Sequence, residues 1–585
     1  MIKIFKNLTK KDLIMILLSV ILIIFQVWLD LKLPDCMSKI TTLIQTEGSK
    51  INDILIQGGY MLLCAFLSLA SSFIVGYLAS MVSSNFSMNL REKIYDKVQK
   101  FSTAEMKKFQ TSSLITRTTN DVMQIEVLIS MGLQMIIKAP IMAIWAVSKI
   151  LNKSIELSIL TGSCVVFLLI SIFIILMIVL PKFKIVQKLI DKINGVTREN
   201  LTGIRVIRAF NAEKYQEDRF EKVNDDLTKT LLFNQKMFAF LTPILTFVMN
   251  FLSLAIYFVG AILINKSLMI DKITTFSNVV VFVSYGMQVI VSFLMLAMIF
   301  MILPRASISA KRINEVLDEE LTIKDGNFDK DTKEKGVVEF KNVSFKYPDA
   351  DEYLLKNISF KANKGEVIAF IGSTGSGKSS LINLIPRFYD ATDGEILIDN
   401  INVKDYKLKT LHDKIGYVSQ KAFMFSTSVS ENIKYGNSKN EIKSGDIEKA
   451  ILIAQGKEFV EKLEGKYNAH IARGGTNISG GQKQRLSIAR AIARNPEIYI
   501  FDDSFSALDY KTDLVLRKEL KKYTKDATSL IVAQRIGTIM NADKIIVLDK
   551  GVCVGIGTHK ELLENCEVYK EIALSQLSKE ELYNA

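Results

Sequence analysis

The chain has 585 residues, of which 49% are hydrophobic, so it is long enough for several domains. Its net charge of +13 comes from Lys and Arg that lie between long apolar runs, not in one patch interleaved with aromatic residues. The topology of a protein that spans a lipid bilayer explains this distribution better than nucleic-acid binding does, and the long apolar runs exclude a protein that handles nucleic acid. The five cysteines have no C-x-x-C spacing, so we expect free thiols and no cysteine-based metal centre.

Six apolar stretches in the first part of the chain have the length of membrane spans. They run from Leu13 to Leu33, Ile54 to Val82, Val127 to Ile150, Leu157 to Leu180, Phe238 to Ile264 and Phe276 to Leu303. The segments after the second and fourth stretches are long and rich in Lys and Arg, whereas those after the first, third and fifth are short. Because basic loops stay in the cytoplasm, the sequence predicts a multi-pass protein of the cytoplasmic membrane with both termini in the cytoplasm.

Helical periodicity continues beyond the second and fourth spans, over Ser84 to Phe101 and Phe183 to Arg208. We therefore expect two long helices that reach well past the bilayer and end in short turns, near Ala104–Leu114 and Ala209–Arg219. Long charged helices that return to the membrane need a surface on which to dock. The two turns are therefore candidates for contact with a soluble domain.

Asp30 is a carboxylate inside the first span, one turn before Pro34. A carboxylate in hydrocarbon is costly unless it faces a water-filled cavity or a partner. The alternative is that the span ends early and leaves Asp30 at the interface with water, beside Lys32. In the cavity interpretation, Asp30 is a candidate substrate-binding residue that favours cations.

A charged helix from Arg305 to Glu320 ends the predicted membrane domain, 1–320, and a polar linker at 321–336 leads to a soluble domain at 337–585. In the soluble domain, Val337 to Phe345 alternates apolar and polar residues as a strand does. From there to the C-terminus, strand patterns alternate with helix patterns. This alternation is typical of a mostly parallel α/β sheet.

A glycine-rich loop follows the apolar run Val367–Ile371, and the apolar start of a helix follows the loop. The spacing is G-x-x-x-x-G-K-[ST], in which backbone N–H groups and the helix N-terminus face an anion. Lys378 would reach the β- and γ-phosphates, and the Ser379 hydroxyl would bind Mg²⁺. The sequence therefore predicts a nucleoside triphosphate site formed by Gly372, Ser373, Thr374, Gly375, Ser376, Gly377, Lys378, Ser379 and Ser380.

Further motifs follow in a fixed order: Gln420 in Tyr-Val-Ser-Gln, the run Ile478-Ser-Gly-Gly-Gln482 before a basic helix, Asp502 at the end of a buried strand, and Ser506-Ala-Leu-Asp509. Together with the six spans, they resemble ABC transporters of the exporter type. The resemblance covers nearly the whole chain. It implies a membrane α-helical bundle of six spans with long cytoplasmic extensions, followed by an α/β P-loop ATPase domain.

The resemblance also implies a role for each motif. The Tyr347 ring would stack on the adenine of ATP, and Asp502 and Gln420 would join Ser379 around Mg²⁺. The signature, formed by Ile478, Ser479, Gly480, Gly481 and Gln482, would begin a helix whose N–H groups hold the γ-phosphate bound by an opposite subunit. The loop formed by Ser506, Ala507, Leu508 and Asp509 belongs to the same site. Because one such chain cannot complete a site, the resemblance implies a second half-transporter as partner.

Two catalytic positions depart from the family pattern. Asp503 stands where a glutamate usually polarises the attacking water, and Gln534 stands where a histidine usually contacts the γ-phosphate. The glutamate usually found before the signature is Ala472 here. A carboxylate misplaced by about an ångström can cost on the order of a hundredfold in rate. We therefore expect a degenerate site that binds ATP without fast hydrolysis, while the signature completes the competent site of a different partner chain.

The resulting prediction is one subunit of a heterodimeric ABC exporter in a bacterial cytoplasmic membrane, with small amphipathic or hydrophobic, drug-like substrates. A homodimeric exporter of lipid or peptide that hydrolyses ATP slowly is the alternative within the class. A membrane-bound sensor or gated channel that only binds ATP is the alternative outside it. The intact signature and Gln420 weigh against that second alternative, because both are needed for coupled turnover.

Overall fold

A computed structural model describes residues 2–46, 48–151, 153–266, 272–436, 442–577 and 582. The chain divides into two compact units, of which the first comprises residues 1–99 and 112–319 and the second residues 100–111 and 320–585. The first unit is helical, and the second contains both strands and helices. The predicted fold class, a membrane helical bundle followed by an α/β P-loop domain, is confirmed.

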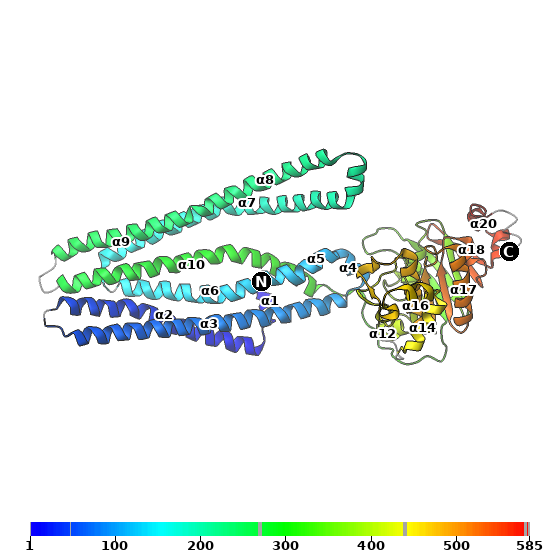
Figure 1. Cartoon of the computed structure of the whole chain (residues 1–585), viewed down its shortest axis with the longest axis horizontal. Coiled ribbons are helices and arrows are strands. Elements are labelled where there is room, and N and C mark those ends of the chain that lie inside the picture. The colour runs from blue at the N-terminus through cyan, green and yellow to red at the C-terminus, as the bar shows by residue number, and fades with distance from the viewer. Residues whose placement is uncertain are drawn as a thin grey trace. The chain divides into compact units, whose positions relative to one another are not determined.

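The first unit consists of long helices (Figure 1). They are α1 (Ile2–Phe5), α2 (Lys10–Gln45), α3 (Ile51–Gln99), α5 (Thr111–Thr116), the π-helix Arg117–Asp121, α6 (Val122–Leu151), α7 (Ile155–Ala209), α8 (Glu213–Ala239), α9 (Leu241–Lys266) and α10 (Lys272–Asp318). Within the described residues, six helical stretches are long and apolar enough to cross a membrane. This agrees with the six predicted spans.

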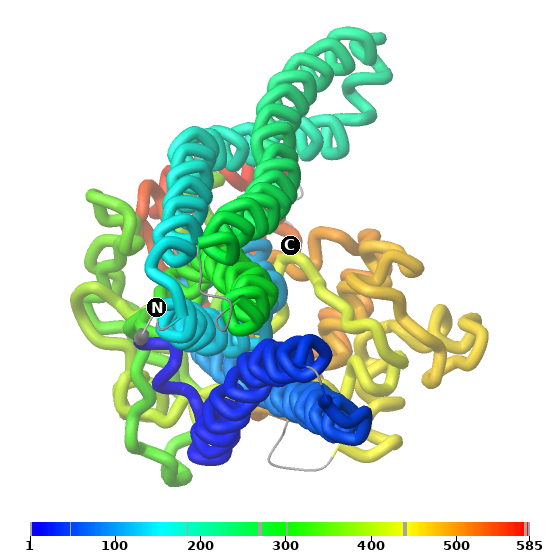
Figure 2. The backbone as a smooth tube through the Cα atoms, turned by 90° about the vertical axis from the view of Figure 1, so that its left-hand side faces the viewer, coloured from blue at the N-terminus to red at the C-terminus, as the bar shows by residue number. Residues whose placement is uncertain are grey.

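The helices that follow the second and fourth spans continue as predicted, because α3 reaches Gln99 and α7 reaches Ala209. In the first unit, α2 lies beside α3 and α7 lies beside α8 (Figure 2). The turn after α3 contains a short helix of the second unit, α4 (Thr103–Phe109). Ser102 caps α4 with its side chain, and the Ser102 N–H donates a hydrogen bond to Glu105 Oε2 at 2.6 Å.

Two prolines do not end the helices in which they lie. Pro304, which stands between the predicted sixth span and the predicted charged helix, lies inside α10, which runs unbroken to Asp318. Pro34 lies inside α2, which continues to Gln45. Membrane helices tolerate proline where neighbouring helices and side chains satisfy the freed backbone groups. Asp30 is therefore well inside a continuous helix.

The second unit is built on a six-stranded sheet with the order β12-β11-β3-β10-β9-β6. Neighbouring strands are parallel except for β11 and β12, which agrees with the predicted mostly parallel sheet. The strands are β3 (Val367–Gly372), β6 (Ile415–Val418), β9 (Ile498–Asp502), β10 (Thr528–Val532), β11 (Lys544–Asp549) and β12 (Val552–Gly557). Every residue of β9 and β10 is buried, because helices cover both faces of a parallel sheet.

A four-stranded antiparallel sheet with the order β2-β1-β4-β5 completes the core of this unit. Its strands are β1 (Val338–Phe345), β2 (Leu355–Ala362), β4 (Asp393–Ile398) and β5 (Ile401–Asn402), and a separate pair joins β7 (Thr427–Ser428) to β8 (His470–Ile471). The helices are α11 (Lys378–Asn383), α12 (Leu408–Asp413), α13 (Val429–Ile433), α14 (Ser444–Ile453), α15 (Lys457–Lys462), α16 (Gly480–Ala493), α17 (Tyr510–Tyr523), α18 (Ile536–Ile539), α19 (His559–Asn565) and α20 (Glu567–Leu574).

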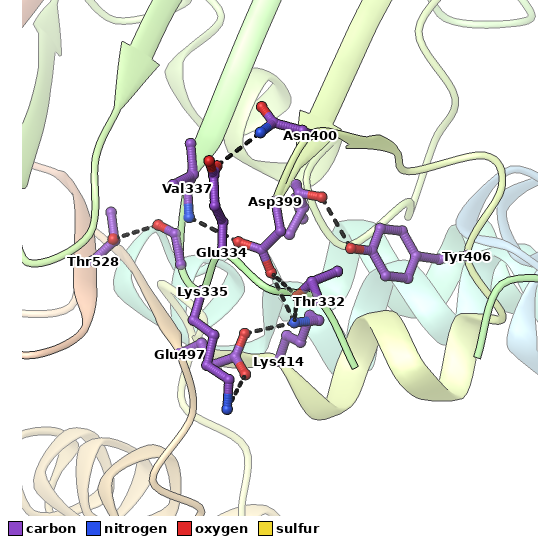
Figure 3. A network of polar contacts seen from close by, with 12 residues as sticks. Thr332, Glu334, Lys335, Val337, Asp399, Asn400, Tyr406, Lys414, Glu497 and Thr528 are labelled. Atoms are coloured by element: carbon purple, nitrogen blue, oxygen red, sulfur yellow. Dashed lines mark hydrogen bonds and ion pairs between the residues drawn. The ribbon is translucent and has the colours of Figure 1, made fainter. Parts of the chain in front are cut away.

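The polar segment before β1 is bound to the surface of the second unit (Figure 3). Lys414 donates hydrogen bonds to Thr332 at 2.9 Å, to Asp399 at 2.7 Å and to Glu497 at 2.6 Å. Asp399 also accepts a hydrogen bond from the backbone N–H of Val337 at 3.0 Å. Burial lowers the pKa of Lys414, but its bonds with the two carboxylates outweigh that effect and hold it above the ordinary lysine value. The predicted linker is therefore a strap fastened by a buried charge cluster.

Candidate functional site

The glycine-rich loop curls around the ammonium group of Lys378. Nζ donates hydrogen bonds at 2.8 Å to the backbone oxygens of Gly372 and Ser373, and its side chain is largely buried. Gly377 has a φ of 94°, and a Cβ there would come within 2.6 Å of Leu355, so only glycine fits at the start of α11. Burial lowers the pKa of Lys378. The loop thus presents a cation and backbone N–H groups at a helix N-terminus, which is the chemistry that a polyphosphate requires.

Ser379 and Asp502 meet beside this loop. The Ser379 hydroxyl donates a hydrogen bond to Asp502 Oδ1 at 2.8 Å, and Asp502 ends the fully buried strand β9. Burial raises the pKa of the Asp502 carboxyl above its ordinary value. A hydroxyl and a carboxylate are hard oxygen ligands, so this pair fits Mg²⁺ carried by a nucleotide.

Asp503 is the centre of a second group of polar side chains. Its Oδ2 accepts hydrogen bonds from two amide groups, Gln420 Nε2 at 3.2 Å and Gln534 Nε2 at 2.9 Å. Burial raises the pKa of Asp503, and the hydrogen bond from Gln420 opposes that rise. The backbone of Asp503 has a φ of 47°, a left-handed conformation that aspartate tolerates better than most residues. The structure thus brings together three residues that lie far apart in the sequence.

Tyr347 lies between the glycine-rich loop and the short helix α4. Its hydroxyl is 2.8 Å from the Ser380 hydroxyl, and its ring meets that of Tyr389 edge to face with centroids 5.2 Å apart. Lys107 of α4 places Nζ 4.5 Å from the centroid of the Tyr347 ring. A hydrogen bond with Tyr389 is the main cause of the raised pKa of Lys107. Sequence reasoning found Tyr347 but missed Lys107, because nothing in the spacing of α4 indicates contact with that ring.

The signature residues lie at the start of α16. Ser479 caps the helix, and its backbone N–H donates to Gln482 Oε1 at 2.8 Å. Ile478 is buried, whereas Ser479 and Gly480 are exposed. A Cβ on Gly481 would come within 3.2 Å of the Ala507 backbone oxygen, so the signature abuts the loop Ser506–Asp509. Among the described residues, no hydrogen bond joins the signature to the glycine-rich loop.

Two glutamines that the motifs did not indicate hold the site residues in place. Gln576 Nε2 donates to the Gln534 backbone oxygen at 2.7 Å, and its Oε1 accepts from the Ile536 N–H at 2.9 Å. Gln484 of α16 donates to the Ser419 backbone oxygen at 3.3 Å, next to Gln420. Both contacts join residues far apart in the sequence, so no local spacing could have revealed them.

In the first unit, Asp30 lies in a group of polar side chains among the membrane-spanning helices. Its carboxylate is 3.1 Å from Lys138 Nζ of α6 and accepts a hydrogen bond from Ser68 of α3 at 2.5 Å. Gln288 of α10 donates to the Asp30 backbone oxygen at 3.1 Å. Both side chains of the ion pair are 19% exposed. Asp30 therefore has a partner within the bundle, and a cationic ligand would have to share the carboxylate with Lys138.

Comparisons with known proteins agree with this combination of a helical bundle and a P-loop site. Residues 16–293 match the family described as the ABC transporter transmembrane region, and residues 355–506 match the family described as ABC transporter. An ABC transporter ATP-binding protein of Mycobacterium tuberculosis, Rv1273c, is 38% identical over 86% of this chain and 85% of its own length. The chain therefore belongs to the ABC transporter family and is an exporter-type half-transporter, with a membrane unit followed by an ATPase domain.

Two other relatives carry functional names. The ATP-dependent lipid A-core flippase of Pseudoalteromonas translucida is 32% identical over 87% of both chains. The putative multidrug export ATP-binding/permease protein YgaD of Bacillus subtilis is 32% identical over 85% of this chain and 84% of its own. The structure of a bacterial Atm1-family ABC exporter with ATP bound has a TM-score of 0.78 and covers 97% of this chain and 98% of its own. At 22% identity, that structure supports the fold alone.

Proposed function

We propose that this chain is the ATP-holding, weakly hydrolysing half of a heterodimeric exporter that moves small amphipathic compounds out across the cytoplasmic membrane, with both termini in the cytoplasm. A half-transporter requires a second chain to form its transport unit. A relative that flips lipid A-core and a relative named for multidrug export both support an amphipathic substrate. Asp30 remains a candidate contact for that substrate, through the ion pair that it makes with Lys138.

The observation that carries the proposal is the environment of Asp503. A general base needs an oxygen that can accept the proton of a positioned water molecule. Here Oδ2 already accepts from Gln420 and Gln534, and the side chain is one methylene shorter than the glutamate of the family pattern. Gln534 replaces a histidine and carries an amide that does not titrate, so it cannot share a proton. The site keeps its phosphate-binding groups but lacks a well-aimed base.

In this proposal, each residue of the site has a separate task toward ATP. Lys378 and the loop N–H groups bind the β- and γ-phosphates, and Tyr347 offers its ring to the adenine. Ser379, Gln420 and Asp502 would hold Mg²⁺, which supplies charge neutralisation at the phosphates. The N–H groups of Ser479, Gly480 and Gly481 would complete the site of the partner chain.

Steady-state ATP hydrolysis by the full-length chain in nanodiscs, without any partner, tests the proposal. We expect slow turnover by the unaltered chain and a rise of at least roughly tenfold in the double variant Asp503→Glu with Gln534→His. Lys378→Ala in the double-variant background is the control and should abolish the gain. Brisk hydrolysis by the unaltered chain, at the rate of the double variant, would overturn the degenerate-site proposal.

The similarity to a lipid A-core flippase also supports a second candidate, a homodimeric lipid exporter. The two candidates differ in what the purified chain does alone. A homodimer would elute at the mass of two copies and show lipid-stimulated ATP hydrolysis that reaches the rate of the double variant. The heterodimer requires a different chain to co-purify before ATP hydrolysis becomes fast.

A further inference from the structure

A cavity of about 450 Å³ lies in the second unit between α17 and α18, against β3 and β10. It is lined by residues of β3 and β10 near the amino ends of these strands, whereas the glycine-rich loop follows the carboxyl end of β3. The cavity and the ATP site therefore lie toward opposite ends of these strands. Its volume is within the range that small-molecule sites occupy.

The basic side of the cavity comes from one face of α17. Leu514, Arg517, Lys518 and Lys521 recur at the spacing of a helical stripe, and all four line the cavity. The residues that line the cavity include no aspartate or glutamate. Lys518 and Lys521 form no ion pair among the described residues, so their charges are available to a ligand.

The opposite wall carries a buried hydroxyl without a partner. Ser529 of β10 is 3% exposed, and its Oγ has no hydrogen-bond partner among the described residues. An unpaired buried polar atom is costly, and a bound group that reaches it would recover that cost. Apolar side chains such as Val367, Ile531 and Ile539 form the rest of this wall.

The frame of the cavity is held by hydrogen bonds. Arg517 is bonded to Asp513 and also donates to the backbone oxygens of Gly537 and Thr538, at 3.0 and 3.1 Å. Asp543, next to the lining residue Ala542, accepts from the Val367 N–H at 2.8 Å. The wall is thus preformed, and the carboxylates of Asp513 and Asp543 are engaged by protein groups.

We propose that this cavity is a second binding site, separate from the ATP site, for a small amphipathic anion such as an aryl or short-chain carboxylate. The head group would lie at Lys518 and Lys521, the apolar body between α17 and α18, and a polar atom at Ser529. Since α18 begins two residues after Gln534, a ligand there would contact the element that follows the catalytic position.

A test of this proposal measures binding of 4-(trifluoromethyl)phenylacetate to the full-length chain in nanodiscs. The readout is the line broadening of the ligand's fluorine NMR signal, compared with the broadening caused by nanodiscs without protein. We expect a Kd on the order of 1 mM, as for other fragments of this size, and at least roughly fivefold weaker binding of the neutral amide analogue. Lys518→Gln with Lys521→Gln should weaken binding of the carboxylate by at least about fivefold. The matched control, Lys409→Gln with Lys560→Gln, removes two exposed charges elsewhere on the same unit and should leave binding unchanged.

Ser529→Ala tests independently whether the buried Ser529 hydroxyl contacts the ligand, and it should weaken binding about two- to fivefold. Lys378→Ala should leave carboxylate binding intact, which separates this site from the fate of the proposed ATP function. Equal binding of the acid and the amide, or unchanged binding in the Lys518 and Lys521 variant, would overturn the proposal. No binding up to about 10 mM would overturn it as well.

Discussion

Lys107 of α4 illustrates how one side chain can hold the ring of Tyr347, the residue that we propose to stack on adenine. Its ammonium lies 4.5 Å from the centroid of the Tyr347 ring and 5.6 Å from that of Tyr389. A cation over one face of an aromatic ring holds the ring in position and leaves the opposite face for a stacked base. Lys107 is therefore a positioning residue for adenine in the proposed site.

We predict that Lys107→Ala weakens ATP binding about two- to fivefold, because a cation–π contact at a partly exposed site contributes about 0.5–1 kcal/mol. Binding of tripolyphosphate, which has no base, should not change. Lys108→Ala is the matched control, since the Lys108 ammonium lies over Phe109 instead. Competition of each ligand with a fluorescent ATP analogue measures both affinities. An equal loss for ATP and tripolyphosphate would show that Lys107 acts on the phosphates or on folding.

At the residue scale, the sequence predicts chemistry well where the chemistry is local. Lys378, Ser379 and Asp502 lie in motifs whose spacing fixes their geometry, and the structure places them together. The contact between Asp503 and two glutamine amides depends on strand order, since Gln420 follows β6 and Gln534 follows β10. No spacing in the chain encodes that order.

At the scale of elements, we expect the charge cluster that fastens the strap to tolerate little change. The Asp399 side chain is fully buried, and that of Lys414 is 6% exposed. Removing one partner of a buried ion pair leaves an uncompensated charge, which costs more than the pair contributes. The strap should therefore detach when Lys414 loses its charge.

We predict that Lys414→Met destabilises the second unit by about 3–5 kcal/mol and exposes residues 321–336 to protease. Lys407→Met is the control, because the ion pair of Lys407 with Asp329 is about half exposed and such exposed pairs contribute little to stability. The cleavage rate in this segment, measured by limited proteolysis of the full chain, distinguishes the two variants. Equal cleavage rates would mean that the cluster does not hold the strap.

The six membrane-length helical stretches described in the first unit were predictable from apolar length alone, but their polar contacts were not. Asp30 stands out in the sequence as a lone carboxylate, and only the packing of α2 against α6 reveals Lys138 as its partner. Lys149 and Asp35 form a second such pair at 2.7 Å. The hydropathy of a segment describes that helix by itself and does not show which helices are its neighbours.

We predict that Asp30→Asn lowers the stability of the membrane unit by on the order of 2–4 kcal/mol, because it leaves Lys138 without a counter-charge among the helices. Adding Lys138→Met should restore most of that loss. Thermal unfolding in nanodiscs measures both effects. If Asp30 also contacts the substrate, the restored double variant will fold normally yet lose transport of cationic compounds more than of neutral ones. Equal transport of both would remove Asp30 from the substrate site.

At the scale of the whole molecule, the proposed function gives the chain two half-sites that act on different ATP molecules. In that proposal the loop around Lys378 binds the chain's own ATP, and the signature at the start of α16, where Ser479 and Gly480 are exposed, serves the ATP of a partner. If the two half-sites serve different ATP molecules, a change in one should leave the other intact. This independence is a property of two-chain assembly and has no equivalent in a single chain.

We predict that Gly481→Asp abolishes most ATP hydrolysis by the complex with its partner while leaving ATP binding by this chain unchanged, because a carboxylate there repels the γ-phosphate of the partner's nucleotide. A Cβ at this position would also press on the Ala507 backbone oxygen, 3.2 Å away. Gly445→Asp is the matched control, since a Cβ there meets no atom within 4 Å and the residue lies in the first turn of α14. Hydrolysis by the purified complex and photolabelling of this chain by an azido-ATP measure the two half-sites separately. Parallel loss of both signals would mean that the signature acts on the chain's own nucleotide, and the division of tasks between two chains would have to be abandoned.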